Sequence, residues 1–161
     1  MEDRACAFTG HRTVKRDHLS ELSPLLDRAI TYAYGEGVRR FLCGGAKGFD
    51  TEAALAVLSF RREHPDVKLC LILPCADQTA GWSEDQARLY EHILEEADSA
   101  EFMSVEYTDD CMRRRNQRLV DESDMLIAYL GHDHSGAAQT VRMARRAAIP
   151  VYNLYPTLDK K

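Results

Sequence analysis

FLCGGAKGFDTEAAL, residues Phe41 to Leu55, passes from an apolar run through a glycine-rich loop into an alanine-rich stretch with helical spacing. This order is typical of a β-strand, a turn and an α-helix. Glycines let the backbone approach a ligand, and the free amides of the next helix attract anions, so the loop Gly44–Gly48 could hold a phosphate. Taken alone, the loop is explained equally well as a tight turn before a helix that Asp50 or Thr51 caps.

The rest of the chain repeats this alternation of strand and helix. Strands are predicted over residues 5–9, 38–43, 67–73, 100–105, 125–130 and 151–154, and helices over residues 24–34, 51–63, 83–97, 109–122 and 137–148. We expect Ser23 to cap the first helix and Pro74 to end the third strand. The pattern predicts an α/β fold in one domain over residues 1–161, with about six strands in a mostly parallel sheet and helices on both faces.

Composition narrows the class of protein. The 161 residues carry a net charge of −5 and a pI near 5.7, which argues against a general nucleic-acid binder. No apolar run is long enough to span a membrane, and the first residues lack the apolar centre of a secretion signal, so we expect a cytoplasmic protein without a membrane partner. Five cysteines without a Cys-x-x-Cys pair are expected to stay reduced.

Polar loops follow three of the predicted strands, where open α/β sheets bind ligands. They are Thr9-Gly10-His11-Arg12, the glycine loop Gly44–Gly48, and Gly131–Gly136. Arginine grips phosphate in a bidentate way and histidine transfers protons, although a solvated turn also accounts for His11 and Arg12. Among the basic residues of the fourth helix, Arg115, next to Asn116, is the candidate to point inward.

Two further groups of residues could contribute to a site. His132, Asp133 and His134 form a polar loop without the spacing of further ligands that a closed metal site needs, so neither a metal nor another cofactor is predicted. Tyr129 and Tyr90 are expected to pack in the core, and Trp82 is a weak candidate to cover a pocket.

Together these motifs resemble the SLOG superfamily, a Rossmann-like group that includes the LOG proteins and the DNA-processing protein DprA. The chain is most similar to the YpsA-like branch. The resemblance rests on the order and spacing of Thr9–Arg12, Gly44–Asp50, Arg115-Asn116 ahead of Val120–Asp124, and Ser135-Gly136, and it covers nearly the whole chain. It implies a Rossmann-like three-layer αβα sandwich.

The resemblance also implies a function. Members of this superfamily bind a nucleotide or nucleotide-derived ligand, for example one like ADP-ribose, and we expect this chain to do so as a sensor or signalling module. LOG-like relatives pair through helices, so a homo-oligomer is an expectation without an interface identified in the sequence. The nucleotide-binding residues expected are Thr9, Gly10, His11, Arg12, Gly44, Gly45, Ala46, Gly48, Asp50, Arg115, Asn116, Gly131, Ser135 and Gly136.

Two alternatives stay open. Similarity to LOG enzymes implies hydrolysis of a nucleoside monophosphate, with Arg115 in the site, but the glutamate of the LOG motif falls on Arg142 here. Arginine cannot act as a carboxylate, so catalysis would need Asp50 or Glu52 in its place. Similarity to DprA implies single-stranded DNA binding, which the arginines of residues 113–118 favour and the net charge opposes.

Overall fold

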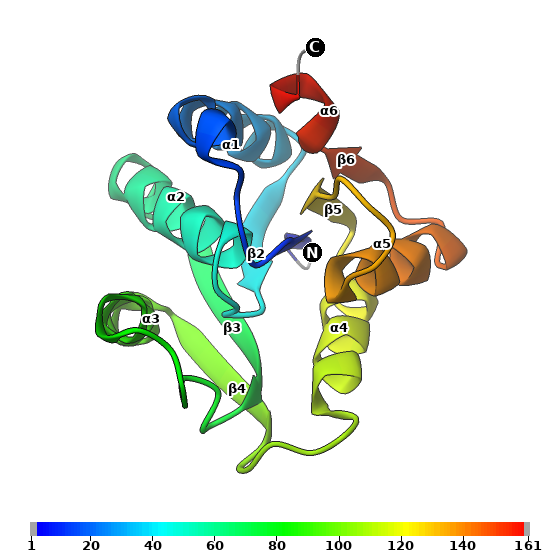
Figure 1. Ribbon diagram of the computed structural model, residues 1–161. Helices are drawn as coiled ribbons and strands as arrows, with labels where there is room; N and C mark the ends of the chain where they lie inside the picture. Colours follow the sequence, from blue (N-terminus) through cyan, green and yellow to red (C-terminus); the bar gives the residue numbers. More distant parts are fainter. Residues whose placement is uncertain (1–2, 160–161) are drawn as a thin grey trace.

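The structure is a computed structural model that describes residues 3–159, and its centre is one six-stranded sheet (Figure 1). All strands are parallel, in the order β4-β3-β2-β1-β5-β6. The strands are β1 (Arg4–Gly10), β2 (Val38–Cys43), β3 (Lys68–Cys75), β4 (Ser99–Ser104), β5 (Met125–Tyr129) and β6 (Val151–Asn153). The strand order reverses at β1, which lies between β2 and β5, so the switch point of the sheet is the gap between the ends of β1 and β5.

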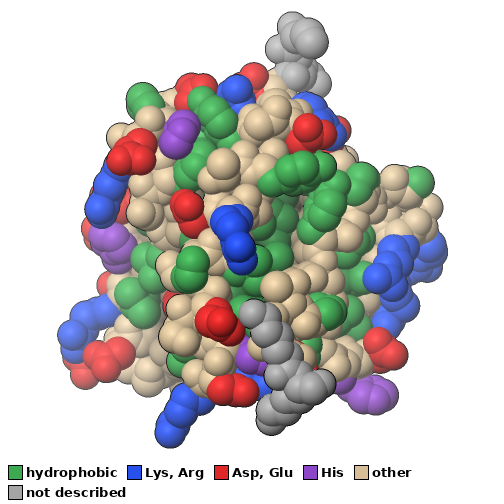
Figure 2. Space-filling model, turned by 90° about the horizontal axis from the view of Figure 1, so that it is seen from above, with side chains coloured by type: hydrophobic (Ala, Val, Ile, Leu, Met, Phe, Trp, Pro, Cys, Tyr) green, Lys and Arg blue, Asp and Glu red, His purple; other side chains and the backbone are tan. Residues whose placement is uncertain are grey.

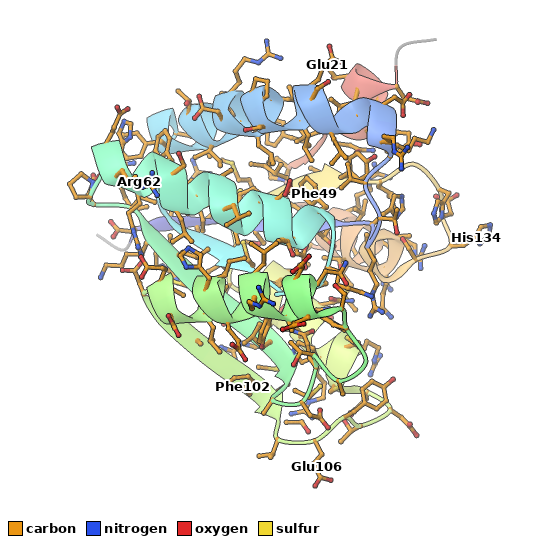
Figure 3. The ribbon with its side chains drawn as sticks, turned by 60° about the vertical axis from the view of Figure 1, so that its left-hand side comes forward. Glu21, Phe49, Arg62, Phe102, Glu106 and His134 are labelled. Atoms are coloured by element: carbon orange, nitrogen blue, oxygen red, sulfur yellow. The ribbon has the colours of Figure 1, made fainter. Side chains whose placement is uncertain are left out.

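Helices cover both faces of this sheet. The helices are α1 (Leu19–Gly35), α2 (Phe49–Glu63), α3 (Glu84–Glu96), α4 (Cys111–Asp121), α5 (Gly136–Arg146) and α6 (Tyr155–Leu158), with a short 3₁₀ turn η1 (Arg16–His18) before α1. Helices α1, α2 and α3 lie in a row on one face, and α4 and α5 lie on the other (Figures 1 and 3). The predicted three-layer αβα sandwich is confirmed.

A hydrophobic core fills each side of the sheet. Phe8, Phe41 and Phe49 are fully buried on the side of α1 and α2, whereas Leu42, Leu126 and Ala144 belong to a second cluster under α4 and α5. Apolar side chains on both faces explain why β5, and residues 69–73 of β3, are continuous apolar runs. Within the described residues, none of the helices has the length and apolar character needed to cross a membrane.

The first helix starts earlier than predicted, and the proposed Ser23 cap is wrong. Helix α1 begins at Leu19 and contains Pro24, which removes one hydrogen bond inside the helix. The acceptor that loses its bond is the carbonyl of Ser20, which lies on the exposed side where water can replace it. Burial of Leu22 on the opposite side favours the longer helix, so tertiary packing outweighs the local signal.

The third strand runs past the residue predicted to end it. β3 continues through Pro74 to Cys75, because β2 ends at Cys43, opposite Leu71. Beyond that point β3 pairs only with β4, so the missing amide hydrogen of proline leaves no bond to β2 unmade. Leu73, directly before Pro74, lies against Gly45 of the glycine-rich loop.

Candidate functional site

A cavity of about 600 Å³ opens at the switch point between β1 and β5. Loops that follow β1, β2 and β5, together with one side of α4 and the first turn of α5, form its wall. Its lining residues are Thr9, Gly10, His11, Arg12, Thr13, Lys15, Ala46, Asp50, Met112, Arg115, Asn116, Leu119, Tyr129, His132, Ser135, Gly136, Ala137 and Tyr155. The three polar loops identified in the sequence therefore meet at one place.

Most of the predicted site residues lie on this wall, but four glycines do not. The ones that line the cavity are Thr9, Gly10, His11, Arg12, Ala46, Asp50, Arg115, Asn116, Ser135 and Gly136, whereas Gly44, Gly45, Gly48, Gly131 and the catalytic candidate Glu52 do not. From the glycine-rich loop, only Ala46 reaches the cavity wall.

The glycines of this loop are required by close packing behind the cavity. A β-carbon on Gly44 would lie 2.6 Å from Nη1 of Arg115, so the absence of a side chain makes room for the guanidinium. Gly48 has a φ of 73° and faces the carbonyl of Arg12, where a β-carbon would come within 2.3 Å of the oxygen. Gly131 similarly faces the ring of Tyr155.

Gly45 gives a direct test of this packing role. A β-carbon there would lie 2.3 Å from Cδ2 of Leu73, at a φ of 73°, whereas Gly81 has a φ of 83° and open space around it. Both replacements by alanine add left-handed strain of about 1–2 kcal/mol, and Gly45→Ala adds overpacking of about 1–3 kcal/mol. We expect urea unfolding to show Gly45→Ala as clearly less stable than Gly81→Ala. Equal stabilities would contradict the packing role.

Arg115 reaches the cavity from α4 and is buried, with 7% of its surface exposed. Its guanidinium donates to the carbonyl of Gly44, to Oδ1 of Asn116 at 2.8 Å and to the sulfur of Met112 at 3.6 Å. These are neutral partners, and no residue of 3–159 forms an ion pair with it. Burial lowers the pKa of Arg115 and the nearby Asp50 opposes this shift, yet a guanidinium keeps its charge. The cavity therefore contains a buried positive charge without a direct counter-ion.

Asp50 lies on the first turn of α2 and faces the same cavity. Its Oδ2 accepts the amide hydrogen of Ala46 at 3.2 Å, while its Oδ1 is buried and has no hydrogen-bond partner among the described residues. Burial raises the pKa of Asp50 to about 6, although Arg115, the Ala46 amide and Arg12 act in the opposite direction. An unpartnered buried carboxylate oxygen is costly, and a hydrogen-bond donor on a ligand would satisfy it.

The first turn of α5 supplies another polar part of the wall. The hydroxyl of Ser135 accepts from the amide of Ala138 at 3.1 Å and caps the helix. The amides of Gly136 and Ala137 belong to the first turn, where no intrahelical acceptor exists. Asn116 packs against this turn by donating to Oε1 of Gln139 at 3.1 Å. The positive end of an eleven-residue helix therefore faces the cavity.

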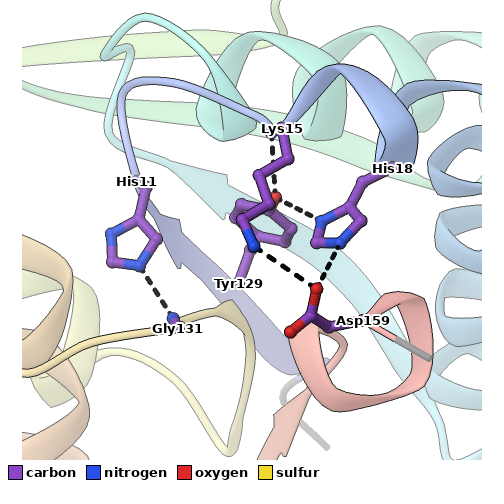
Figure 4. Close-up of polar contacts among 6 residues, drawn as sticks. All are labelled: His11, Lys15, His18, Tyr129, Gly131 and Asp159. Atoms are coloured by element: carbon purple, nitrogen blue, oxygen red, sulfur yellow. Dashed lines mark hydrogen bonds and ion pairs between the residues drawn. The ribbon is translucent and has the colours of Figure 1, made fainter. Parts of the chain in front are cut away.

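His11 joins the loop after β1 to the loop after β5 (Figure 4). Its Nε2 accepts the amide hydrogen of Gly131 at 2.8 Å, and its ring stacks on that of His132 with centroids 4.2 Å apart. Because Nε2 is an acceptor, the neutral ring carries its hydrogen on Nδ1. Burial, and next the neighbouring His132, lower the pKa of His11.

We expect the pKa of His11 to respond to an anionic ligand. In the free protein its ring should titrate below 6.5, and stability should fall as the pH decreases from 6.5 through that lowered value, because protonation costs the folded state more than the unfolded one. A bound phosphate should raise the midpoint. An NMR titration of the His11 ring with and without phosphate measures both. A midpoint unaffected by ligand would place His11 outside the binding site.

The hydrogen-bonded group behind Tyr129 was not predicted from the sequence. The phenol oxygen accepts the amide hydrogen of Lys15 at 3.1 Å and bonds Nδ1 of His18 at 2.7 Å, while Nε2 of His18 contacts Asp159 Oδ1 at 3.2 Å (Figure 4). Lys15 Nζ contacts the same carboxylate oxygen at 3.3 Å. These contacts hold the Tyr129 ring, which is fully buried as predicted and also forms part of the cavity wall.

Tyr155, on α6, lines the cavity but was not predicted as a site residue. Only the path of the chain after β6 brings it there. Its ring lies 6.3 Å from that of His11 and 5.0 Å from that of Tyr129. Trp82, in contrast, does not line the cavity and packs on Tyr90. Within residues 3–159, no group of three or more His, Cys, Asp or Glu side chains is arranged to hold a metal ion.

Structural comparison places the chain beside DNA-processing protein A. The protein from Streptococcus pneumoniae superposes with a TM-score of 0.65 at 16% identity, over 92% of this chain and 49% of the other. The protein from Helicobacter pylori, described for its single-stranded DNA binding mode, gives 0.64 at 18% identity, over 92% and 64%. This chain spans about half to two thirds of their length, and the likeness shows a shared fold.

Sequence comparison gives closer relationships. UPF0398 proteins from Bacillus thuringiensis (strain Al Hakam) and Bacillus cereus (strain AH187) are each 26% identical over 163 residues, covering 94% of this chain and 89% of the relative. The model of the YpsA family, described as the YspA SLOG family, matches residues 7–152, which include all three cavity loops. The resemblance read from the sequence motifs is confirmed, and the chain belongs to the YpsA SLOG family.

Proposed function

We propose that this protein binds a nucleotide or nucleotide-derived anion in the cavity at the switch point and acts as a sensor or signalling module. The observation that carries the proposal is the pair of buried side chains facing one cavity: within residues 3–159, Arg115 has no counter-ion and Asp50 has an oxygen without a hydrogen-bond partner. An anion would neutralise the first, and a hydroxyl donor would satisfy the second. A ribose phosphate carries both groups.

The charge of the cavity supports an anionic ligand. Its wall has three basic side chains, Arg12, Lys15 and Arg115, and one acidic side chain, Asp50, whereas the whole chain has a net charge of −5. The start of α5 adds the positive end of a helix dipole. A basic cavity in an acidic protein favours a small anion, since the surrounding charge repels extended polyanions.

An aromatic end of the cavity supports a ligand with a planar ring. Tyr155, His11 and His132 lie on the side of the cavity formed by the loops after β1 and β5, and Arg115 and Asp50 approach from α4 and α2. A nucleotide could contact both ends of the cavity. Its base would pack against the aromatic side chains, and its phosphate would lie near Arg115 and the first turn of α5. Asp50 would then accept a hydrogen bond from a ribose hydroxyl.

The test is isothermal titration calorimetry of AMP, ADP, NAD and ADP-ribose against the wild-type protein, followed by assay of each sample for free base and ribose phosphate. Binding without product supports a sensor or signalling module. Inorganic phosphate is titrated as well. If it bound as tightly as every nucleotide, the protein would not recognise the nucleoside part of the ligand. No binding by any of these ligands would overturn the proposal.

A second candidate function is hydrolysis of a nucleoside monophosphate, and one observation favours it. A carboxyl group whose pKa is raised to about 6 can transfer a proton near neutral pH, and Asp50 has this property at the cavity wall. Arg142 is exposed on α5 and does not line the cavity, so a reaction would depend on Asp50. Base released by the wild type and abolished by Asp50→Asn would support this candidate.

Single-stranded DNA binding has weaker support. The arginines of α4 are largely engaged: Arg118 binds Glu101 and Glu122, and Arg114 donates to the carbonyl of Met103. On the face shown in Figure 2, acidic and basic side chains are interspersed. Oligonucleotide binding with a steep dependence on salt concentration would favour this candidate over the nucleotide proposal.

A further inference from the structure

The strand β4 (Ser99–Ser104) leaves one edge of the sheet open. It is the last strand in the order and, in the described part of the chain, pairs only with β3 (Figure 1). Four of its six residues, 99–102, are exposed, and Figure 3 shows Phe102 on this outer strand. An open edge presents amide and carbonyl groups that another strand can pair with. The opposite edge strand, β6, has only three residues.

The hydrogen bonds to β3 identify which backbone groups point outward. Asp98 donates its amide hydrogen to the carbonyl of Leu69 at 2.9 Å, and the carbonyl of Ser104 accepts from Ala76 at 3.2 Å. Backbone groups alternate in direction along a strand, so the even-numbered residues face β3. Ser99, Glu101 and Met103 therefore turn their amides and carbonyls toward the free edge. Arg114 already donates to the Met103 carbonyl at 3.0 Å, but a carbonyl can accept a second bond.

The edge lacks the features that usually prevent pairing. It contains no proline and no lysine, and its one charged side chain, Glu101, is bound by the guanidinium of Arg118. Exposed apolar side chains gather beside it instead: Phe102, Val105 and Tyr107 have 40%, 78% and 59% of their surface exposed. Such a strand is suited to contact with another strand.

We propose that two copies of this chain pair through β4, antiparallel about a two-fold axis at Phe102. In this register Glu101 of one copy is opposite Met103 of the other, so the outward amides and carbonyls of the two strands meet in pairs. The two Phe102 side chains are opposite each other, and within residues 99–104 no charged side chain is opposite another of the same sign. The sheet then continues through both copies. A second copy fits this edge because the strand is complementary to itself in this register.

The first test is the mass of the protein in solution, measured by light scattering after gel filtration. We expect twice the chain mass of 18.3 kDa for the wild type and a single chain mass for Met103→Pro. Proline at this position removes an outward amide hydrogen and none that bonds β3, so the variant should stay folded. Met103→Ala also loses the packing of this side chain against the core but keeps the amide, so it is the matched control and should remain dimeric. Phe102→Lys, which sets two cations against each other across the axis, should also be monomeric.

A cross-link tests the register, with a matched control at the other edge. Phe102→Cys should form a covalent dimer when oxidised glutathione is added, since the α-carbons of directly opposed residues lie within disulfide range. Tyr152→Cys, on β6 and 38% exposed, should not. A monomeric wild type, a dimer that survives both Met103→Pro and Phe102→Lys, or a cross-link at Tyr152 alone would overturn the proposal. Ligand binding in the cavity at β1 and β5 is a separate measurement and does not enter these outcomes.

Discussion

Replacing Arg115 by lysine is expected to weaken nucleotide binding by about 100-fold while the protein stays folded. The guanidinium offers several donors in a fixed planar arrangement, and lysine keeps the charge but loses that fork. The loss of one or two charge-assisted hydrogen bonds in a buried site costs about 3 kcal/mol, which corresponds to about 100-fold in the dissociation constant. Calorimetry with the tightest ligand of the nucleotide series measures the change.

Arg113 provides the matched control for this prediction. It lies two residues away on α4, is exposed and does not line the cavity. Arg113→Ala should therefore bind nucleotide as the wild type does, and both variants should retain the circular dichroism spectrum of the folded protein. If Arg115→Lys bound as tightly as the wild type, or if Arg113→Ala lost as much affinity, the anion would not be held by the buried guanidinium.

Replacing Asp50 by asparagine is expected to stabilise the free protein at pH 8 by up to about 3 kcal/mol and to weaken ligand binding at the same time. The pKa of this carboxyl is about 6 in the folded protein, compared with an ordinary value of 3.8. At about 1.36 kcal/mol per pKa unit, ionisation of Asp50 costs the folded state about 3 kcal/mol. Asparagine removes that cost, but it also removes the carboxylate oxygen that would accept from a ligand hydroxyl.

The dependence on pH makes this prediction specific. Because the folded pKa is raised, the contribution of Asp50 to stability is full below pH 3.8 and is lost as the pH rises through about 6. The advantage of Asp50→Asn should therefore be absent near pH 3.8 and complete above about pH 7. Urea unfolding of both proteins across this range measures it. Glu52→Gln, which changes a half-buried carboxylate on the same turn of α2 that does not line the cavity, is the control for the substitution itself.

An Asp50→Asn variant that is less stable than the wild type at pH 8 would show that Arg115 and Arg12 compensate the buried charge fully. An increase in stability combined with lost binding would instead identify Asp50 as a residue kept for function at a cost in stability. This second outcome is the one expected of a polar group that is buried without a hydrogen-bond partner among the described residues.

The sequence by itself determined the layers of this protein and the loops that form its cavity. Apolar runs such as residues 69–73 and 125–129 have the continuous hydrophobicity of parallel strands covered on both faces, and loop residues after each run mark the carboxyl ends of the strands. Carboxyl ends of parallel strands share one edge of the sheet. The sequence therefore predicts that three groups of residues lie close together: Thr9–Arg12, Asp50 and Ser135–Gly136.

Only the tertiary structure decided what each residue does there. The glycines Gly44, Gly45 and Gly48 look like a phosphate loop in the sequence, yet contacts with Arg115, Leu73 and Arg12, distant along the chain, account for them. Helix α1 starts before the predicted residue because Leu22 is buried, and β3 continues through Pro74 because β2 has already ended there. The buried charges of Arg115 and Asp50, and the contacts of Tyr129 with His18, depend on distances between segments that no local pattern contains. Spacing along the chain encodes secondary structure, whereas burial and charge pairing arise only when separate segments pack together.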